Sequence, residues 1–397
     1  MEDTQNNTLP FDVQTDILLK LPVKSLVRFR CVSKCWRTLI TSHRFINLHR
    51  LTNNQTNQPQ NSNASNLVVL VGNSKILTYE FSGSQVTCKL PSPPILFNSY
   101  DLIGSSNGIL CLRHPSSLPL RALALYNPTT GDYRVLMSLM TCEFEFHVCH
   151  DNAEFGYDHT SNDFKIVSLQ QDHRPYIYRL RNNSWEIIEL HDSSLLRRFY
   201  GIFTKTMVIA NNALHWHVKS HASPGERTSL LAFDLGNEEF YEVPLPERDT
   251  CSSQHCKDYC EHIDWELANL RGYLHLSIVE FSGRCSHCFP RIEIWIMKEY
   301  GVKQSWTKLL HYSLKEVTDL FANRSTPIIQ YPKHIWPQVY GYSKDGQEIL
   351  VGLKSAPKNF FSCHLQTREV KKVSVLSDEK TGAFRLVPWT CTFACIL

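Results

Sequence analysis

Two short patterns in the sequence have residue types and spacings that could support chemistry. The first is Gly104-Ser105-Ser106-Asn107-Gly108, which fits the Gly-x-Ser-x-Gly spacing around a nucleophilic serine. In enzymes this spacing works where a strand precedes the serine and a helix follows it, because the sharp turn then exposes the hydroxyl. Here an apolar, strand-like run follows at 109–112. We therefore expect a hairpin turn at this position and no catalytic residue.

The second pattern is a group of cysteines in the second half of the chain. Cys256 and Cys260 precede the pair Cys285 and Cys288 by a loop-sized interval. Zinc binds four thiolate or imidazole ligands, commonly as two close pairs. The second pair has a suitable spacing, whereas the first pair is spaced loosely. We expect free thiols at all four positions and no cofactor, with a structural zinc site as the alternative.

Other sequence features also favour a protein without catalytic residues. The sequence contains no glycine-rich phosphate loop, no His-Glu-x-x-His motif and no convincing carboxylate pair. His215 and His217 flank Trp216 in a strand-like run, so we expect them to be packed inside the fold. Aromatic residues alternate as in a β core without a basic stripe beside them, and nucleic-acid binding is therefore not expected.

The composition bounds the class of protein. With 397 residues, the chain is longer than one typical domain. The net charge of +3 indicates no global attraction to nucleic acid or to membranes. No apolar signal segment is found at the N-terminus, and no apolar run is long enough to cross a bilayer. We therefore expect a cytoplasmic or nuclear protein whose 14 cysteines stay reduced.

The elements that must position any functional residue begin with three short helices in residues 9–40. Apolar residues at helical spacing predict the first helix, and Pro22 ends it because proline disfavours helical geometry in the preceding residue. A second helix follows, and Ser33 is the expected N-cap of a third. The apolar positions are Val13, Ile17, Leu18 and Leu21 on one stripe of the first helix, Leu26, Val27, Phe29 and Val32 on the second helix, and Trp36, Leu39 and Ile40 on the third.

These helices carry more apolar surface than they can bury among themselves, since about 40 residues is near the lower limit for an independent core. Part of that surface is therefore expected to be an interface. Residues 1–50 contain eight Lys or Arg against four Asp or Glu, which favours an acidic partner.

This N-terminal segment resembles the F-box. The resemblance rests on Leu9-Pro10, Asp12, Ile17-Leu18, the run LPVKSL at 21–26, the run RFRCVSK at 28–34 and Trp36, at ungapped spacing. It implies that the segment binds a Skp-type adaptor, which in turn bridges to a cullin scaffold. Some of the implied contact residues must also form the core of the helices; they are Leu9, Pro10, Ile17, Leu18, Leu21, Pro22, Leu26, Phe29, Val32 and Trp36.

The rest of the chain reads as a linker followed by a β domain. Residues 52–66 are almost entirely Asn, Gln, Ser and Thr, which cannot bury apolar surface. We therefore divide the chain into a helical domain at 1–50, a linker at 51–66 and a β domain at 67–397.

The β domain contains an internal repeat of strand-like runs and turns. Period lengths near 50 residues, with four strands per copy, are typical of β-propeller blades. A sixth blade is expected to combine strands in 67–90 with the C-terminal segment 384–396 and so to close the ring. The expected fold is a three-helix domain followed by an all-β, propeller-like domain of about six blades, with an irregular β-sandwich as the alternative. Five copies align, 52, 55, 62 and 68 residues apart, on Tyr126, Tyr178, Phe233, Trp295 and Cys363.

The β domain is similar to the plant F-box-associated domain. The similarity rests on YNPTTG at 126–131, FGYD at 155–158, NDFKIV at 162–167 and IWIMKEY at 294–300, and covers nearly all of 100–375. The last phrase is also similar to relatives of the self-incompatibility locus F-box proteins. Neither a Gly-Gly doublet nor a Trp-Asp dipeptide occurs, so the kelch and WD40 signatures are not met.

Together these resemblances imply a substrate receptor of an SCF-type ubiquitin ligase. Such a receptor recruits a target protein for ubiquitination and proteasomal degradation, and it acts by proximity without catalytic residues. The alternative is a stand-alone propeller that binds a ligand or glycan. Target contacts are expected from loops at one end of the β domain, with candidates at 191–206, 219–229, 247–265 and 312–337.

Overall fold

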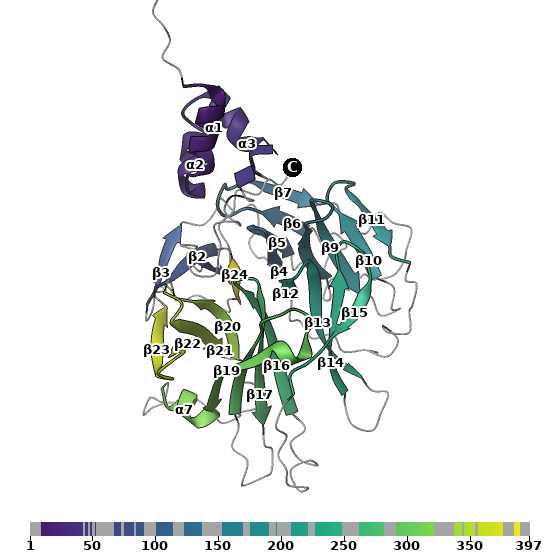
Figure 1. Ribbon diagram of the computed structural model, residues 1–397, viewed down its shortest axis with the longest axis vertical. Coiled ribbons are helices and arrows are strands. Elements are labelled where there is room, and N and C mark those ends of the chain that lie inside the picture. Colours follow the sequence, from purple (N-terminus) through teal and green to yellow (C-terminus); the bar gives the residue numbers. More distant parts are fainter. Residues whose placement is uncertain are drawn as a thin grey trace, which may run out of the picture.

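A computed structural model shows a small group of helices beside a ring of β-sheets (Figure 1). The residues that the structure describes are 9–42, 44–46, 48–49, 52, 67–72, 75–82, 85–90, 101–113, 123–136, 153–169, 175–189, 196, 208–220, 227–247, 262–281, 291–320, 337–343, 345–353, 356–375 and 385–389. No helix among these residues is long and apolar enough to cross a membrane.

Three short helices lie between residues 11 and 41, and further helical residues are described at 44–46, 48–49 and 52. Pro22 directly precedes the second helix, and the Ser33 hydroxyl accepts a hydrogen bond from the backbone N–H of Trp36 at the start of the third. The predicted helices and the predicted cap are therefore confirmed. The helices are α1 (Phe11–Leu19), α2 (Val23–Phe29) and α3 (Lys34–Thr41).

Most of the other described residues belong to strands. A short 3₁₀ helix, η3 (Lys303–Ser305), and one α-helix, α7 (Leu314–Asp319), flank β19. The strands are β1 (Leu67–Gly72), β2 (Lys75–Ser82), β3 (Gln85–Leu90), β4 (Asp101–Ser106), β5 (Ile109–Arg113), β6 (Leu123–Tyr126), β7 (Tyr133–Leu136), β8 (Ala153–Asp158), β9 (Asp163–Leu169), β10 (Pro175–Arg179), β11 (Ser184–Ile187), β12 (Val208–Ala210), β13 (Ala213–Ser220), β14 (Arg227–Asp234), β15 (Phe240–Val243), β16 (His262–Leu270), β17 (Tyr273–Phe281), β18 (Arg291–Met297), β19 (Trp306–Ser313), β20 (Pro337–Tyr342), β21 (Glu348–Leu353), β22 (Ala356–His364), β23 (Val370–Val375) and β24 (Arg385–Trp389).

These strands form four-stranded antiparallel units, which we call blades 1 to 6. Blades 1 to 5 are consecutive in the chain and consist of β4–β7, β8–β11, β12–β15, β16–β19 and β20–β23. Blade 6 combines the two ends of the β domain in the order β24-β1-β2-β3. By hydrogen bonding the described strands make five sheets, because β23 and β3 join blades 5 and 6 through a short parallel pairing.

The C-terminal strand closes the ring. β24 pairs with β1 in antiparallel register, from Val71 opposite Arg385 to Leu67 opposite Trp389. This pairing covers the edge of β1 that would otherwise be exposed beside the ring's interior. The predicted propeller, with about six four-stranded units and a blade built from both ends of the domain, is confirmed, and the β-sandwich alternative is wrong.

The hydrophobic core lies between the blades. One apolar cluster fills each interface between consecutive blades from blade 1 to blade 5. All six residues of β8 and all seven of β9 are buried, as expected for inner strands covered on both faces. Packing is so close at Gly156 in β8 that a Cβ atom there would lie 2.8 Å from Cδ1 of Leu235 in blade 3.

The two ends of the blades are distinct. At the turn end, hairpin turns join the first two strands of the blades, for example at Asn211 and Asn212, which have positive φ angles of 49° and 58°. Bonds between blades meet at this end: the Ser106 hydroxyl accepts from the Tyr157 N–H, and the Asn212 amide donates to Asp158. We call the opposite end of the strands the loop end.

Equivalent side chains link successive blades. Lys165, His215 and His275 are each the third residue of the second strand, in blades 2, 3 and 4 respectively. His215 Nε2 lies 2.7 Å from the Tyr300 hydroxyl of blade 4, and His275 Nε2 lies 2.7 Å from the Tyr342 hydroxyl of blade 5. The ring is therefore held by polar bonds between blades as well as by apolar packing.

Because of these two histidines, we expect the free energy of unfolding to depend on pH. Burial lowers the pKa of both His215 and His275 from 6.5 to about 4, so they stay neutral in the folded protein. In the unfolded chain each histidine becomes protonated near its ordinary pKa of 6.5. Between about pH 6.5 and about pH 4 the unfolded state therefore binds more protons than the folded state. Stability is therefore lost as the pH falls from about 6.5 to about 4.

The expected size is about 2 kcal/mol of unfolding free energy per histidine between about pH 7 and about pH 5. Urea unfolding of wild type and of a His215→Gln/His275→Gln variant at both pH values measures it. The variant should lose clearly less stability on acidification than wild type does. An equal loss in both proteins would show that these histidines are not the groups responsible.

Candidate docking surface

The helical domain is built around four buried side chains. Leu18, Leu26 and Ile40 are 0% exposed and Phe45 is 1% exposed. This small core leaves much of the surrounding apolar surface in contact with solvent. The half-exposed side chains packed around it are Leu19, Leu21, Val23, Val27, Phe29, Trp36, Leu39 and Ile46.

Polar and aromatic contacts hold α1 and α3 in one orientation. The Trp36 indole N–H donates to Gln14 Oε1 at 2.7 Å, and the Gln14 amide donates to the Leu9 carbonyl oxygen at 2.6 Å. The Trp36 ring also packs on Phe29, with ring centroids 5.5 Å apart. The outward side chains of these helices are therefore presented on a fixed surface.

The outer surface of the helical domain concentrates exposed apolar side chains. Of the nine large apolar side chains that are exposed among the described residues, six belong to this domain. Such a concentration of exposed apolar side chains on a small domain is typical of a protein–protein interface. We call these six residues the docking surface: Leu9 (56% exposed), Phe11 (54%), Val13 (42%), Ile17 (47%), Val32 (60%) and Leu48 (37%).

The ten residues assigned to adaptor contact from the sequence fall into three groups. Leu18 and Leu26 are fully buried, so they shape the helical domain from inside. Leu21, Phe29 and Trp36 are half-buried against the core. The exposed members are Leu9, Pro10, Ile17, Pro22 and Val32.

Two details of the helix prediction are corrected by the structure. The sequence predicts Val13, Ile17 and Leu18 on one apolar stripe, but Val13 and Ile17 are exposed and only Leu18 is buried. Val32 was expected on the second helix, which instead ends at Phe29, and the Val32 N–H closes a turn onto the Phe29 carbonyl oxygen. Helical periodicity predicts which residues share a face but not which face meets the core.

Three residues of the docking surface are missing from the sequence-based list of ten. They are Phe11, Val13 and Leu48. Val13 and Ile17 are four residues apart and therefore neighbours on the outward side of α1, which is a signal the sequence contains. Leu48 follows the predicted helices and had no such signal.

The helical domain contacts the turn end of blade 1. Arg30, at the C-terminal end of α2, lies 3.8 Å from Asp132 in the turn before β7. Figure 1 shows the helices next to the strands of this blade. An ion pair this exposed and this long contributes little stability, but it marks the side of the propeller on which the helices lie.

The serine pattern is a hairpin, as predicted. Ser106 ends β4, Asn107 and Gly108 turn with φ angles of 47° and 77°, and β5 follows directly. The Ser106 hydroxyl is buried and accepts the Tyr157 N–H at 2.9 Å. The hydroxyl thus serves the contact between blades 1 and 2.

The histidine prediction is also confirmed, whereas the cysteine prediction stays a prediction. His215 and His217 are 0% and 4% exposed within β13, and His217 stacks on Trp265 of blade 4. No group of potential metal ligands occurs within the described part of the chain. The possible zinc ligands lie outside that part; they are Cys256, Cys260, Cys285 and Cys288.

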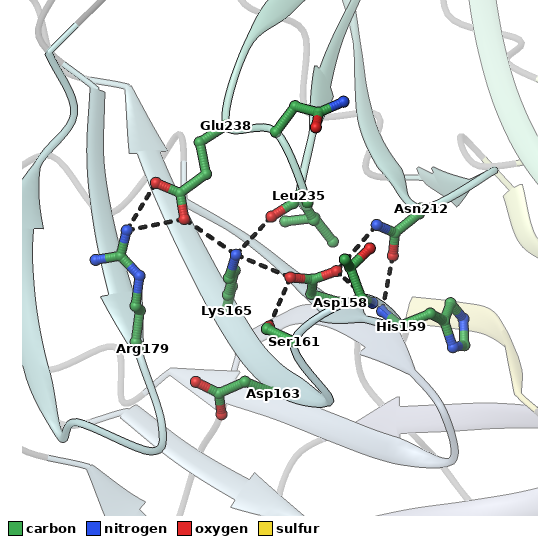
Figure 2. Close-up of polar contacts among 12 residues, drawn as sticks. Asp158, His159, Ser161, Asp163, Lys165, Arg179, Asn212, Leu235 and Glu238 are labelled. Carbon is green, nitrogen blue, oxygen red and sulfur yellow. Dashed lines mark hydrogen bonds and ion pairs between the residues drawn. The ribbon is translucent and has the colours of Figure 1, made fainter.

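A cluster of charged side chains, of which Lys165 and Asp158 are buried, lies between blades 2 and 3 (Figure 2). Lys165 Nζ lies 3.0 Å from Asp158 Oδ2 and 3.0 Å from Glu238 Oε1. Arg179 donates to both oxygens of Glu238 at 2.8 and 2.7 Å. Glu238 belongs to the β14–β15 turn of blade 3, so the cluster ties two blades together.

The charge on Asp158 is stabilised by the protein around it. Burial alone would raise the pKa of this carboxyl, but hydrogen bonds from Ser161, Asn212 and Lys165 outweigh burial and hold the pKa well below its usual range. Asp158 therefore remains a carboxylate, and its described contacts serve to join blades 2 and 3. Lys165 interrupts an otherwise apolar strand run, which is the sequence signal for this cluster.

The fold and the docking surface together define a class of protein, namely a small helical docking module at the turn end of a β-propeller. Family models match both parts: the F-box domain at residues 7–48 and the F-box associated beta propeller domain at residues 69–380. The chain belongs to the family of F-box proteins with an F-box associated beta propeller domain. The resemblances to the F-box and to the plant F-box-associated domain are thereby confirmed, whereas the similarity to self-incompatibility locus F-box relatives stays a prediction.

Relatives with similar sequences carry the same kind of name. The chain is 28% identical to an F-box/kelch-repeat protein of Arabidopsis thaliana, over 79% of this chain and 81% of the relative. It is 27% identical to the F-box protein CPR1 of Arabidopsis thaliana, over 93% of this chain and 84% of the relative. Among solved structures, the polysaccharide lyase Uly1 is similar at a TM-score of 0.39 and 7% identity, over 78% of each chain, which is too little to transfer an activity.

Proposed function

We propose that this protein is the substrate-recognition subunit of an SCF-type ubiquitin-protein ligase. In this proposal the helical domain binds a Skp-type adaptor, which bridges to a cullin scaffold, while the propeller holds a target protein for ubiquitination and proteasomal degradation. The chain contributes no catalytic group, because holding the target near the charged conjugating enzyme raises the effective concentration of its lysines.

The observation that carries the proposal is the docking surface. Six exposed large apolar side chains on so small a domain cost hydration free energy unless a partner covers them. Ile17 is 47% exposed and Val32 is 60% exposed, and neither belongs to the buried core. Leu18 and Leu26 act differently in this proposal, because they support the surface from beneath.

The arrangement of the two domains supports a division of labour. The helical domain contacts the turn end of blade 1, through Arg30 and Asp132. The candidate target loops connect described strands. The direction of those strands places the loops' ends at the loop end of the blades, opposite the helical domain. A target bound there would be held away from the adaptor. The candidate loops lie largely outside the described residues; they are 191–206, 219–229, 247–265 and 312–337.

The test is binding of a purified Skp-type adaptor to the full chain and to an Ile17→Glu/Val32→Glu variant. Both positions are exposed, so the fold should persist while two apolar contacts are replaced by charges. We expect at least about 100-fold weaker binding, since loss of anchor residues typically costs 2 kcal/mol or more. Isothermal calorimetry gives the affinity, and a melting curve checks the fold.

Ile187→Glu is the matched control, because Ile187 is also an exposed isoleucine, 40% exposed, but lies on β11 of the propeller. It should bind the adaptor as wild type does. A wild-type chain that does not bind the adaptor would refute the proposal and favour the stand-alone, ligand- or glycan-binding propeller. Equal binding by wild type and the Ile17→Glu/Val32→Glu variant would refute the assigned surface.

A further inference from the structure

We propose that β7, the outer strand of blade 1, is a docking edge for an extended segment of a partner protein in which apolar residues flank an acidic one. The inference concerns the propeller and does not require that the helical domain binds an adaptor. It rests on the strand's free edge, on its exposed apolar side chains and on the arginine between them.

The free edge follows from the sheet order. Blade 1 runs β4-β5-β6-β7, so among the described strands none pairs with the outer edge of β7. Such an edge displays backbone N–H and C=O groups that an added strand can bond. The outer edges in this propeller do accept strands: Ser374 and Val375 of β23 pair with Gln85 and Val86 of β3.

Side chains along β7 alternate between two environments. Tyr133 and Val135 lie on one face and are 56% and 46% exposed. Leu136 on the other face is 3% exposed and belongs to the core between blades 1 and 2. Arg134 shares that face, with its guanidinium 3.4 Å from the Asn183 side-chain oxygen of blade 2. The apolar pair therefore points away from blade 2 and toward solvent.

The other outer strands are protected where β7 is not. Proteins commonly place charged side chains on exposed edge strands to prevent unwanted pairing. The exposed side chain of β15 is Glu242 and that of β19 is His311, while β11 exposes Glu186 next to Ile187. β7 instead exposes two apolar residues in alternation. Its edge thus lacks the usual protection and suits a specific partner.

The pattern of the partner follows from pairing across strands. On an added strand, the residues next to Tyr133 and Val135 share their face and gain most by being apolar. The residue between them shares the face of Arg134, which favours a carboxylate. The fitting segment is therefore apolar, acidic, apolar. One end of the segment would lie beside the helical domain, because Asp132, which Arg30 contacts, directly precedes β7.

The test measures fluorescence anisotropy of two labelled peptides, TVEFT and TVKFT, on the full chain. Wild type should prefer the glutamate peptide, and Arg134→Glu should reverse the preference, a result that a merely structural role of the arginine would not produce. A Tyr133→Ser/Val135→Thr variant should bind the glutamate peptide about tenfold more weakly. Ile187→Thr, the matched change on β11, should leave binding unchanged.

Three outcomes would overturn the inference. The first is no binding of the glutamate peptide by wild type at millimolar concentration, the result expected if another part of the chain covers this edge. The second is a peptide preference that does not depend on the charge at position 134. The third is a dimer in sedimentation velocity that the Tyr133→Ser/Val135→Thr change dissolves, which would assign the edge to a second copy of this chain.

Discussion

Removal of residues 384–397 is expected to abolish cooperative folding of the propeller. The deletion takes away β24, whose backbone pairs with β1 from Val71 to Leu67 and which forms the inner strand of blade 6. Without it, β1 becomes a free edge next to the ring's interior, and among the described strands only β23 and β3 still pair blades 5 and 6. A melting curve followed by circular dichroism should lose its sharp transition, and the protein should aggregate.

A shorter deletion provides the control. Removing residues 391–397 leaves β24 (Arg385–Trp389) complete, so the melting temperature should change by only a few degrees. If instead the longer deletion melted as sharply as wild type, closure of the ring by the C-terminal strand would not be needed for stability. That result would contradict the role assigned to β24.

Lys165→Met is expected to cost about 3–5 kcal/mol of unfolding free energy, because it leaves the buried Asp158 carboxylate without its cation. The Lys165 side chain is 4% exposed and that of Asp158 is 1% exposed, so water cannot replace the lost contact. Chemical denaturation with urea measures the loss. Because the cluster joins blades 2 and 3, the transition should also broaden as their coupling weakens.

Two further variants test whether the loss of stability comes from an unpaired buried charge. Adding Asp158→Asn to Lys165→Met removes the unpaired charge and should recover part of the lost stability. Lys303→Met removes a lysine from an ion pair of similar length, 2.7 Å to Glu247, but both side chains are well exposed there. It should leave the free energy of unfolding nearly unchanged, because solvent screens so exposed a pair. Equal losses from Lys165→Met and Lys303→Met would argue that burial of the charges is unimportant.

The propeller was predictable because its signals are local and repeated. Strand-like runs and positive-φ turns such as Asn107-Gly108 recur with a period that only a few folds share. Closure by the C-terminal segment followed from the same reasoning, since strands in 67–90 lacked an inner partner. The number of blades could be inferred from the count of repeats alone, without knowledge of contacts between distant residues.

The docking surface was predictable only in part. The F-box resemblance covers the right segment, but it does not separate contact residues from core residues. Ile17 and Leu18 are adjacent in the sequence and both apolar, yet one is 47% exposed and the other 0%. Their environments differ because α2 and α3 pack on one side of α1, and that side depends on tertiary contacts such as the bond from Trp36 to Gln14.

Contacts between blades were not predictable for a related reason. Lys165 bonds to Glu238, 73 residues away, and His215 to Tyr300, 85 residues away. The sequence marks Lys165 and His215 as unusual within a strand but does not say which later turn lies beside each of them. The distance between two residues along the sequence does not show that they are in contact. Such contacts can be assigned only once the arrangement of the blades in the ring is known.

By itself, therefore, the sequence determined the class of fold, the repeat and its closure, and the family to which the chain belongs, because periodicity, turn chemistry and a dense local motif are properties of short segments. Only the tertiary structure decided which apolar residues of the helices face solvent, how Lys165 and Asp158 are paired, and that β7 has a free, apolar edge. Those features depend on which surfaces remain uncovered after packing, and burial is a property of the folded chain as a whole.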